Sequence, residues 1–362
     1  MYYFNVIDLF PYVFLFIILF LIINRKRKKN RLLHIAIIVF IFLAIRYGIG
    51  YDYFEYRNMI LHPDSKQVEA LAQSLINLCS KFHFQYFFVI TSFLSIYPIY
   101  IVSRKYSVDP VLSFMVYILI PVLFLDGMST IRNTIAYSMV LWSFMILLRE
   151  REKYLALLPF AIALGFHSSS IVAFAIFPLA FIQFKRKTAL LIWIISFFVS
   201  QGFIGGVLLN LINLPFLSKA TWYLLYAEEN DAGRTLWVAV NIINLINFFF
   251  WNKLYDKNRD NLKFLMIYNL GCVIYNLTIN IDPTIALRLS NFCNIILILL
   301  LPYYVYVLPY NVRKNRRLIY AFLIVYFCSM FLVVILGTPL GDKISFLPYQ
   351  TIFNYINYYN YQ

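Results

Sequence analysis

The chain has 362 residues, of which 62% are hydrophobic, 20% aromatic and 13% charged, and its formal net charge is +15. Soluble domains carry about 25% charged residues, so this composition excludes a soluble globular protein and predicts a polytopic integral membrane protein. Lipid offers the backbone no hydrogen-bond partner and the apolar runs are too long for barrel strands, so we expect an all-α fold. Lys and Arg occur in short clusters between apolar runs, which is typical of membrane topology signals and not of a nucleic-acid partner.

The apolar runs predict about 12 transmembrane helices in a single transmembrane domain that covers residues 1–362. Two of these runs, 154–166 and 170–184, are short, and a re-entrant pair is the alternative to two full spans. In chain order the predicted spans are 4–24, 32–45, 82–103, 110–125, 131–148, 154–166, 170–184, 188–211, 236–251, 264–279, 285–308 and 318–336.

Every second connection between these spans is rich in Lys and Arg. The positive-inside rule places such connections in the cytoplasm and therefore predicts that both termini lie on the periplasmic side. Two longer polar segments, 46–81 and 213–235, are then expected outside. The predicted cytoplasmic basic loops are 25–31, 104–105, 149–153, 185–187, 252–263 and 311–317.

Arg46-Tyr-Gly-Ile-Gly-Tyr-Asp52-Tyr-Phe-Glu-Tyr56 follows the second span directly and puts charges at the membrane edge. Ionisable groups in such a place are functional candidates by default. We expect Asp52 to be a general base for a hydroxyl group, with an ion pair to Arg46 or Arg57 as the alternative.

Ser129-Thr-Ile-Arg132-Asn133 opens the fifth span. The exposed amides of a first helical turn favour an anion, whereas an Arg there has the wrong sign for the helix dipole. Arg132 together with these amides therefore predicts a phosphate- or pyrophosphate-binding site. The alternative is an Arg side chain that only extends to the membrane–water interface, without a functional role.

Two further residues are expected at the same outer level. Arg288 lies shortly after Pro283, which can start a helix, and it could bind a second acidic group or pair with Asp282. His167 lies between the two short spans and could act as a hydrogen-bonding group or general base, although a lone His is more often a satisfied structural residue.

The four Cys residues are far apart, and no His, Cys and Asp cluster has the spacing of a metal site. Nucleotide-binding loops and a serine nucleophile elbow are also missing from the sequence. We therefore expect no metal and no cofactor, and any reaction must draw its energy from the substrate.

Taken together, these motifs resemble the EpsG-type branch of Wzy-like bacterial polysaccharide polymerases. The similarity extends over about residues 46–288. One departure is Asn133, which stands where the family commonly has Gln. The motifs that carry the resemblance are the stretch Arg46 to Tyr56, Ser129-Thr-Ile-Arg132-Asn133, Phe166-His167-Ser-Ser and Ala286-Leu-Arg288.

The resemblance implies a GT-C-like architecture in the bacterial inner membrane, with the active site facing the periplasm. It implies a metal-independent glycosyltransferase that joins oligosaccharide repeat units carried on undecaprenyl pyrophosphate. The expected partners are these lipid-linked oligosaccharides, membrane lipids, a flippase and a chain-length regulator. A ligase or acyltransferase with the same outer-face geometry, and a flippase for lipid-linked glycan, are the alternative functions.

On this hypothesis Arg132 and Arg288 bind the donor pyrophosphate and stabilise charge on the leaving group. Arg46 orients Asp52 or contacts the same phosphates. Asp52 is the first choice for the base that activates the acceptor hydroxyl, and His167 is the second. The residues expected to position sugar or phosphate are Tyr56 and Asn133.

Overall fold

The computed structural model describes most of the chain. The described residues are 6–24, 30–203, 231–257, 260–307, six positions between 325 and 335, and 346–353. The predictions for 213–230, 311–317 and most of the twelfth span lie outside them.

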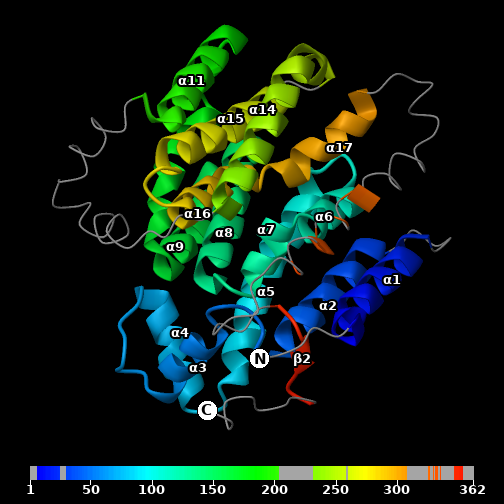
Figure 1. The fold of residues 1–362 in the computed structure, drawn as a ribbon, viewed down its shortest axis with the longest axis vertical. Coiled ribbons are helices and arrows are strands. Elements are labelled where there is room, and N and C mark those ends of the chain that lie inside the picture. Colours follow the sequence, from blue (N-terminus) through cyan, green and yellow to red (C-terminus); the bar gives the residue numbers. More distant parts are fainter. Residues whose placement is uncertain are drawn as a thin grey trace.

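The described part of the chain is almost entirely helical, as expected for this membrane protein (Figure 1). Short 3₁₀ segments join several of the helices, and α11 continues into a π-helical turn, Val199–Phe203. The α-helices are α1 (Phe10–Asn24), α2 (Arg31–Ala44), α3 (Tyr53–Leu61), α4 (Ala70–Ser80), α5 (Gln85–Tyr106), α6 (Pro110–Leu119), α7 (Pro121–Phe124), α8 (Ile131–Arg149), α9 (Leu157–Phe166), α10 (Ala173–Ile176), α11 (Arg186–Phe198), α14 (Asp231–Lys257), α15 (Asp260–Thr278), α16 (Pro283–Asn294) and α17 (Leu297–Val307). The 3₁₀ segments are η1 (Val6–Leu9), η2 (Leu125–Gly127), η3 (Lys153–Ala156), η4 (Ser168–Val172) and η5 (Phe177–Ala180).

Two of the described helices, α5 and α8, are each long and apolar enough to cross a membrane. The pair α16 and α17, bent by 56° at a short break, is a third candidate. Helices α14 and α15, with 27 and 19 residues, are long enough but are not among the helices that are also apolar enough. The remaining predicted spans within the described residues are helical but shorter or interrupted. The number of twelve and the orientation of the termini therefore stay predictions.

Proline causes one of these interruptions. Pro121 is the first residue of α7, and Ile120 before it has an extended conformation with ψ 106°. A residue before proline avoids the helical region because its backbone would collide with the proline ring. The predicted span 110–125 is therefore divided into α6 and α7.

The region of the two short predicted spans also consists of short pieces. Segments η3 and α9 run together as Lys153–Phe166, and η4, α10 and η5 run as Ser168–Ala180. His167 is the extended residue between them, with φ −155° and ψ 124°. Both pieces are shorter than the roughly 20 residues of a full span. Two full spans and a re-entrant pair therefore remain the two alternative interpretations.

Helix α8 is the centre of the fold, because it packs against α5, α9 and α16. Of its membrane-length window, 78% is buried inside the protein, compared with 56% for α5. A residue at the start of α8 is therefore surrounded by several other elements, which is the setting of a composite site.

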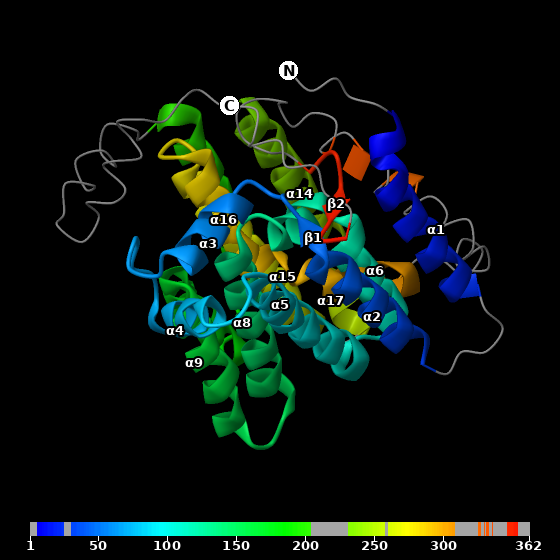
Figure 2. The ribbon, with the colours of Figure 1, turned by 90° about the horizontal axis from the view of Figure 1, so that it is seen from below.

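Helices α3 and α4 lie together at one end of the molecule, where α4 also contacts α5 and α9 (Figure 1). At this end a two-stranded sheet that the sequence did not predict joins distant parts of the chain (Figure 2). Strand β1 (Arg46–Tyr47) pairs antiparallel with β2 (Gln350–Thr351), and Ile352 donates its N–H to Ile45 at 3.0 Å. The C-terminal segment thus holds the first motif in place.

Candidate functional site

Glu69, a residue that no sequence motif singled out, lies at the centre of a polar cluster. Its Oε2 atom forms an ion pair with Nη1 of Arg132. Its Oε1 atom accepts the backbone N–H of Ser168 at 3.0 Å and lies 3.1 Å from Nδ1 of His167. One carboxylate therefore connects the start of α4, the start of α8 and the corner between α9 and η4.

The backbone around Glu69 explains why its side chain reaches these partners. Glu69 is the N-cap of α4 in an extended conformation, and its side chain makes no capping bond to its own helix. On the facing helix α9, Gly165 lacks a Cβ atom that would lie only 2.5 Å from Cγ of Leu71. The bare glycine lets α4 pack directly against α9, which brings Glu69 to His167.

Tyr56 supplies the second support of the arginine. Nε of Arg132 donates to the Tyr56 hydroxyl at 3.2 Å, and the guanidinium lies 6.0 Å from the ring centroid. Nη2 of Arg132 has no hydrogen-bond partner among the described residues. This part of the guanidinium remains available to a ligand.

Asp52 lies within electrostatic reach of the same phenol. Burial raises the pKa of Tyr56, the charge of Arg132 lowers it, and the carboxylate of Asp52 raises it further. The structure therefore brings Asp52, Tyr56, Arg132 and His167 into one region, as the sequence analysis expected of them. Their roles in a reaction stay predictions.

The charge state of Glu69 follows from its partners. Burial alone would raise the pKa of Glu69, but the hydrogen bonds from His167 and Ser168 and the charge of Arg132 outweigh it. Together they hold the pKa of this carboxyl well below its usual range. The side chain is 20% exposed and ionised at neutral pH, so it offsets the positive charge of Arg132.

Arg46 has none of its surface exposed. Its Nη1 atom donates to the carbonyl of Leu43 and to Oγ of Ser92 at 3.3 Å, and Nη2 donates to the carbonyl of Gly127 at 3.4 Å. The guanidinium also lies 5.2 Å from the centroid of the Phe88 ring. In this conformation Arg46 joins α2, α5 and η2, and its predicted contact with phosphate stays a prediction.

The two glycines of the first motif allow a tight backbone there. Gly48 and Gly50 have φ angles of 65° and 97°, which disfavour other residues. A Cβ atom on Gly50 would lie 2.6 Å from the carbonyl carbon of Met128. The motif therefore packs directly on the segment before α8, where Tyr51 donates its N–H to Ser129 at 3.2 Å.

Polar groups without partners lie on the neighbouring faces. Asn133 is only 3% exposed, yet neither atom of its amide has a hydrogen-bond partner among the described residues. In the same part of the chain, the Oγ1 atom of Thr130, the Oγ atom of Ser170 and the Nε atom of Arg288 are also buried and unpaired. Buried polar groups in proteins nearly always have partners, so each of these atoms is a candidate to bind a polar ligand or water.

Arg288 does not pair with Asp282 in this structure. Asp282 caps α16 by accepting the N–H of Ile285 at 2.7 Å, and the ion pairs of the described residues do not include Arg288. On neighbouring helices, the rings of Tyr137 and Phe292 lie 6.4 Å apart.

The predicted topology starts both helices at the outer face, and on this prediction Arg132 and Arg288 are expected at similar heights. Arg132 precedes Tyr137 by about 7.5 Å of helix, and Arg288 precedes Phe292 by about 6 Å, at a rise of about 1.5 Å per residue. The two arginines are thus expected on the same level of the packed pair α8 and α16.

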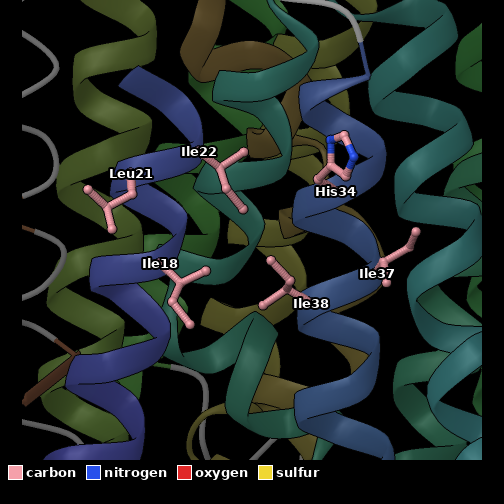
Figure 3. Close-up of a pocket in the computed structure, with 6 residues that line it drawn as sticks. All are labelled: Ile18, Leu21, Ile22, His34, Ile37 and Ile38. Carbon is pink, nitrogen blue, oxygen red and sulfur yellow. The ribbon is translucent and has the colours of Figure 1, made fainter. Parts of the chain in front are cut away.

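A separate groove of about 300 Å³ lies between α1 and α2 (Figure 3). Among the described residues its lining contains no Lys or Arg side chain that could bind a phosphate group. His34, on its lining, is 12 residues before Arg46, or about 18 Å along a helix. Its lining residues are Ile18, Leu21, Ile22, His34, Ile37 and Ile38.

The cluster can bind an anion and accept a proton. It offers the guanidinium of Arg132, the imidazole of His167 and the carboxylate of Asp52. No group of three or more His, Cys, Asp and Glu side chains within the described ranges could hold a metal ion. Sequence reasoning missed Glu69 because a carboxylate before an amphipathic helix is an ordinary helix cap. Its position in the outer segment was the signal that could have found it.

The family model described as the EpsG family matches residues 31–351 of the chain. The matched region includes every residue of the cluster, together with Arg46 and Arg288. No curated protein and no solved structure matches the chain.

Proposed function

Since the chain belongs to the EpsG family, as its motifs indicated, we propose that this membrane protein of polysaccharide biosynthesis polymerises lipid-linked repeat units. The donor is a growing glycan on undecaprenyl pyrophosphate, and the acceptor is the next lipid-linked unit. The reaction takes place at the periplasmic face of the bacterial inner membrane. The observation that carries the proposal is Arg132, which is held from two sides while Nη2 stays available.

The donor pyrophosphate binds to Arg132 and Arg288. A guanidinium forms strong, directed hydrogen bonds with phosphate oxygens, and a preorganised cation stabilises charge that develops on the leaving group. The unpaired amide of Asn133 and the first turn of α8 supply further polar groups. Tyr56 fixes the plane of the Arg132 guanidinium through its Nε atom.

In the reaction, the acceptor hydroxyl oxygen forms a bond with the anomeric carbon of the donor sugar. The bond between that carbon and the pyrophosphate oxygen breaks, and its electron pair leaves with undecaprenyl pyrophosphate. The hydroxyl proton passes to a base, for which Asp52 and His167 are the two candidates. Because the donor is activated by its pyrophosphate, neither a nucleotide nor a metal is required.

Complementation tests this function. A strain that lacks the gene receives wild type, Arg132→Ala or Arg288→Ala at matched protein abundance, and its surface glycan is separated by length. Each of the two variants should lose the long chains. Arg104→Ala serves as the control, because this side chain is exposed and, among the described residues, its hydrogen bond and its ring contact are both with Tyr100. Normal chain lengths with Arg132→Ala would remove the basis of the proposal.

The same deletion strain separates the alternative functions. Loss of a polymerase leaves glycan with a single repeat unit. Loss of a ligase leaves lipid-linked polymer that is not transferred, loss of an acyltransferase removes acyl groups, and loss of a flippase leaves the units on the cytoplasmic side.

A further inference from the structure

The bonds of the Glu69 carboxylate determine where His167 carries its proton. An ionised carboxylate can only accept hydrogen bonds. Its Oε1 atom accepts from the backbone amide of Ser168, and the same oxygen lies 3.1 Å from Nδ1 of His167. Two groups that both lack hydrogen would repel at this distance, so Nδ1 must carry a hydrogen atom.

The other ring nitrogen is then the one that can accept a proton. When the imidazole is neutral, a hydrogen on Nδ1 leaves the lone pair on Nε2. Nε2 has no hydrogen-bond partner in the part of the chain that the structure describes, and the side chain is 17% exposed. Nε2, the ring nitrogen that does not bind Glu69, is therefore the one suited to act as a base.

Glu69 also balances the charges that arise during proton transfer. When Nε2 takes up a proton, the imidazole becomes a cation near the guanidinium of Arg132. The carboxylate contacts both groups, one with each oxygen, and so stabilises the cation that forms. Carboxylates that orient a catalytic imidazole act in this way without taking the proton themselves.

We propose that Glu69 is a positioning residue that holds His167 in the Nδ1–H form, so that Nε2 of His167 is the base for the acceptor hydroxyl. This proposal rests on the proposed function. The proton moves from the hydroxyl to Nε2 as the oxygen bonds to the anomeric carbon, and it returns to water after the pyrophosphate leaves. Asp52 then acts on Tyr56 and through it on Arg132.

Replacement of Glu69 by glutamine reverses the hydrogen-bond pattern. The amide has a single oxygen, and it turns to the cationic Arg132 because a charge-assisted hydrogen bond is the stronger one. The NH₂ group then faces His167, and the hydrogen bond from the backbone N–H of Ser168 is lost. An NH₂ group donates, so it requires a lone pair on Nδ1. Glu69→Gln therefore moves the hydrogen to Nε2 and removes the base while the size of the side chain is kept.

The first measurement is nitrogen NMR of the full chain in nanodiscs with ¹⁵N-labelled histidine. The chain has 4 His residues, and the signal that disappears in His167→Gln identifies His167. Neutral His167 should show the Nδ1–H form in wild type and the Nε2–H form in Glu69→Gln. Glu55→Gln is the matched control, because this carboxylate of the same outer segment pairs with exposed Lys66, and it should leave the signal unchanged.

The second measurement is polymerisation with lipid-linked repeat units isolated from the deletion strain. Glu69→Gln should lower the rate by about 100-fold or more, the usual contribution of general base catalysis. Glu55→Gln should keep the wild-type rate.

Two results would overturn the proposal. One is an Nε2–H form of His167 in wild type. This measurement does not need the variant, so it tests the proposal even if the Glu69→Gln protein does not accumulate. The other is an unchanged or faster rate of polymerisation by Glu69→Gln, and a faster rate would mean that Glu69 competes with the substrate for Arg132. Failure of the proposed function looks different, because Arg132→Ala would then make normal chains whatever the NMR signal of His167.

Discussion

Gly50→Ala is expected to separate the first motif from the segment before α8. A Cβ atom there would lie 2.6 Å from the carbonyl carbon of Met128, with its oxygen closer still. Backbone does not move aside as a flexible side chain can. Gly50 also has φ 97°, outside the range that other residues adopt at low cost.

The magnitude follows from these two effects. A residue held at such a φ costs about 1–3 kcal/mol, and insertion of a methyl group into a packed contact costs about 1–3 kcal/mol more. Gly50→Ala should therefore lower the free energy of unfolding by about 2–6 kcal/mol. It should also displace Tyr51, whose N–H bonds to Ser129.

Gly48→Ala is the matched control in the same motif. Gly48 has φ 65°, and the nearest atom to its added Cβ is the tip of the Phe54 ring at 3.3 Å. A non-glycine residue in this left-handed region costs about 1–2 kcal/mol, and the ring can turn aside. Thermal unfolding of purified protein in detergent should show the larger loss for Gly50→Ala. Equal losses, or a larger loss for Gly48→Ala, would refute the close packing on Met128.

Three further predictions concern the site and its supports. Gly165→Val should push Leu71 and α4 away from α9, and the His167 NMR signal should then resemble that of Glu69→Gln. Arg46→Ala should cost at least about 2 kcal/mol, because buried carbonyls lose their donors, whereas Arg288→Ala should stay within about 1 kcal/mol; unfolding midpoints compare the two. The depressed pKa of Glu69 means that its ionised form stabilises the fold above its usual pKa of 4.5, and that this stabilisation is lost as the pH falls further. The difference in unfolding midpoint between wild type and Glu69→Gln should therefore be constant above about pH 5.5 and shrink below about pH 4.5.

The sequence predicted the positions of most helices well. The apolar run 131–148 became α8, Ile131–Arg149, and the polar stretch around Asp52 became the end of the molecule where α3 and α4 lie. Such features depend on local composition, which the sequence shows directly. Pro121 divided one predicted run, and the number of twelve spans stays a prediction.

The site was predicted only in part. Arg132, His167 and Tyr56 were recognised because ionisable and phenolic groups at a membrane edge are costly and need a reason. Arg46 was recognised for the same reason, but the structure buries it completely under the motif. Its sequence position at the end of α2 does not reveal which neighbours cover it.

The sequence by itself determined that this is a helical membrane protein of the EpsG family, and it predicted arginines, a histidine and a carboxylate near one level. Only the tertiary structure decided that Glu69 joins them, since it is 63 residues from Arg132 and 98 residues from His167 along the chain. That contact requires α4 to pack on α9 at Gly165, and packing between distant segments depends on shape in three dimensions. Composition and spacing show which chemical groups are present, whereas packing determines which of these groups contact each other.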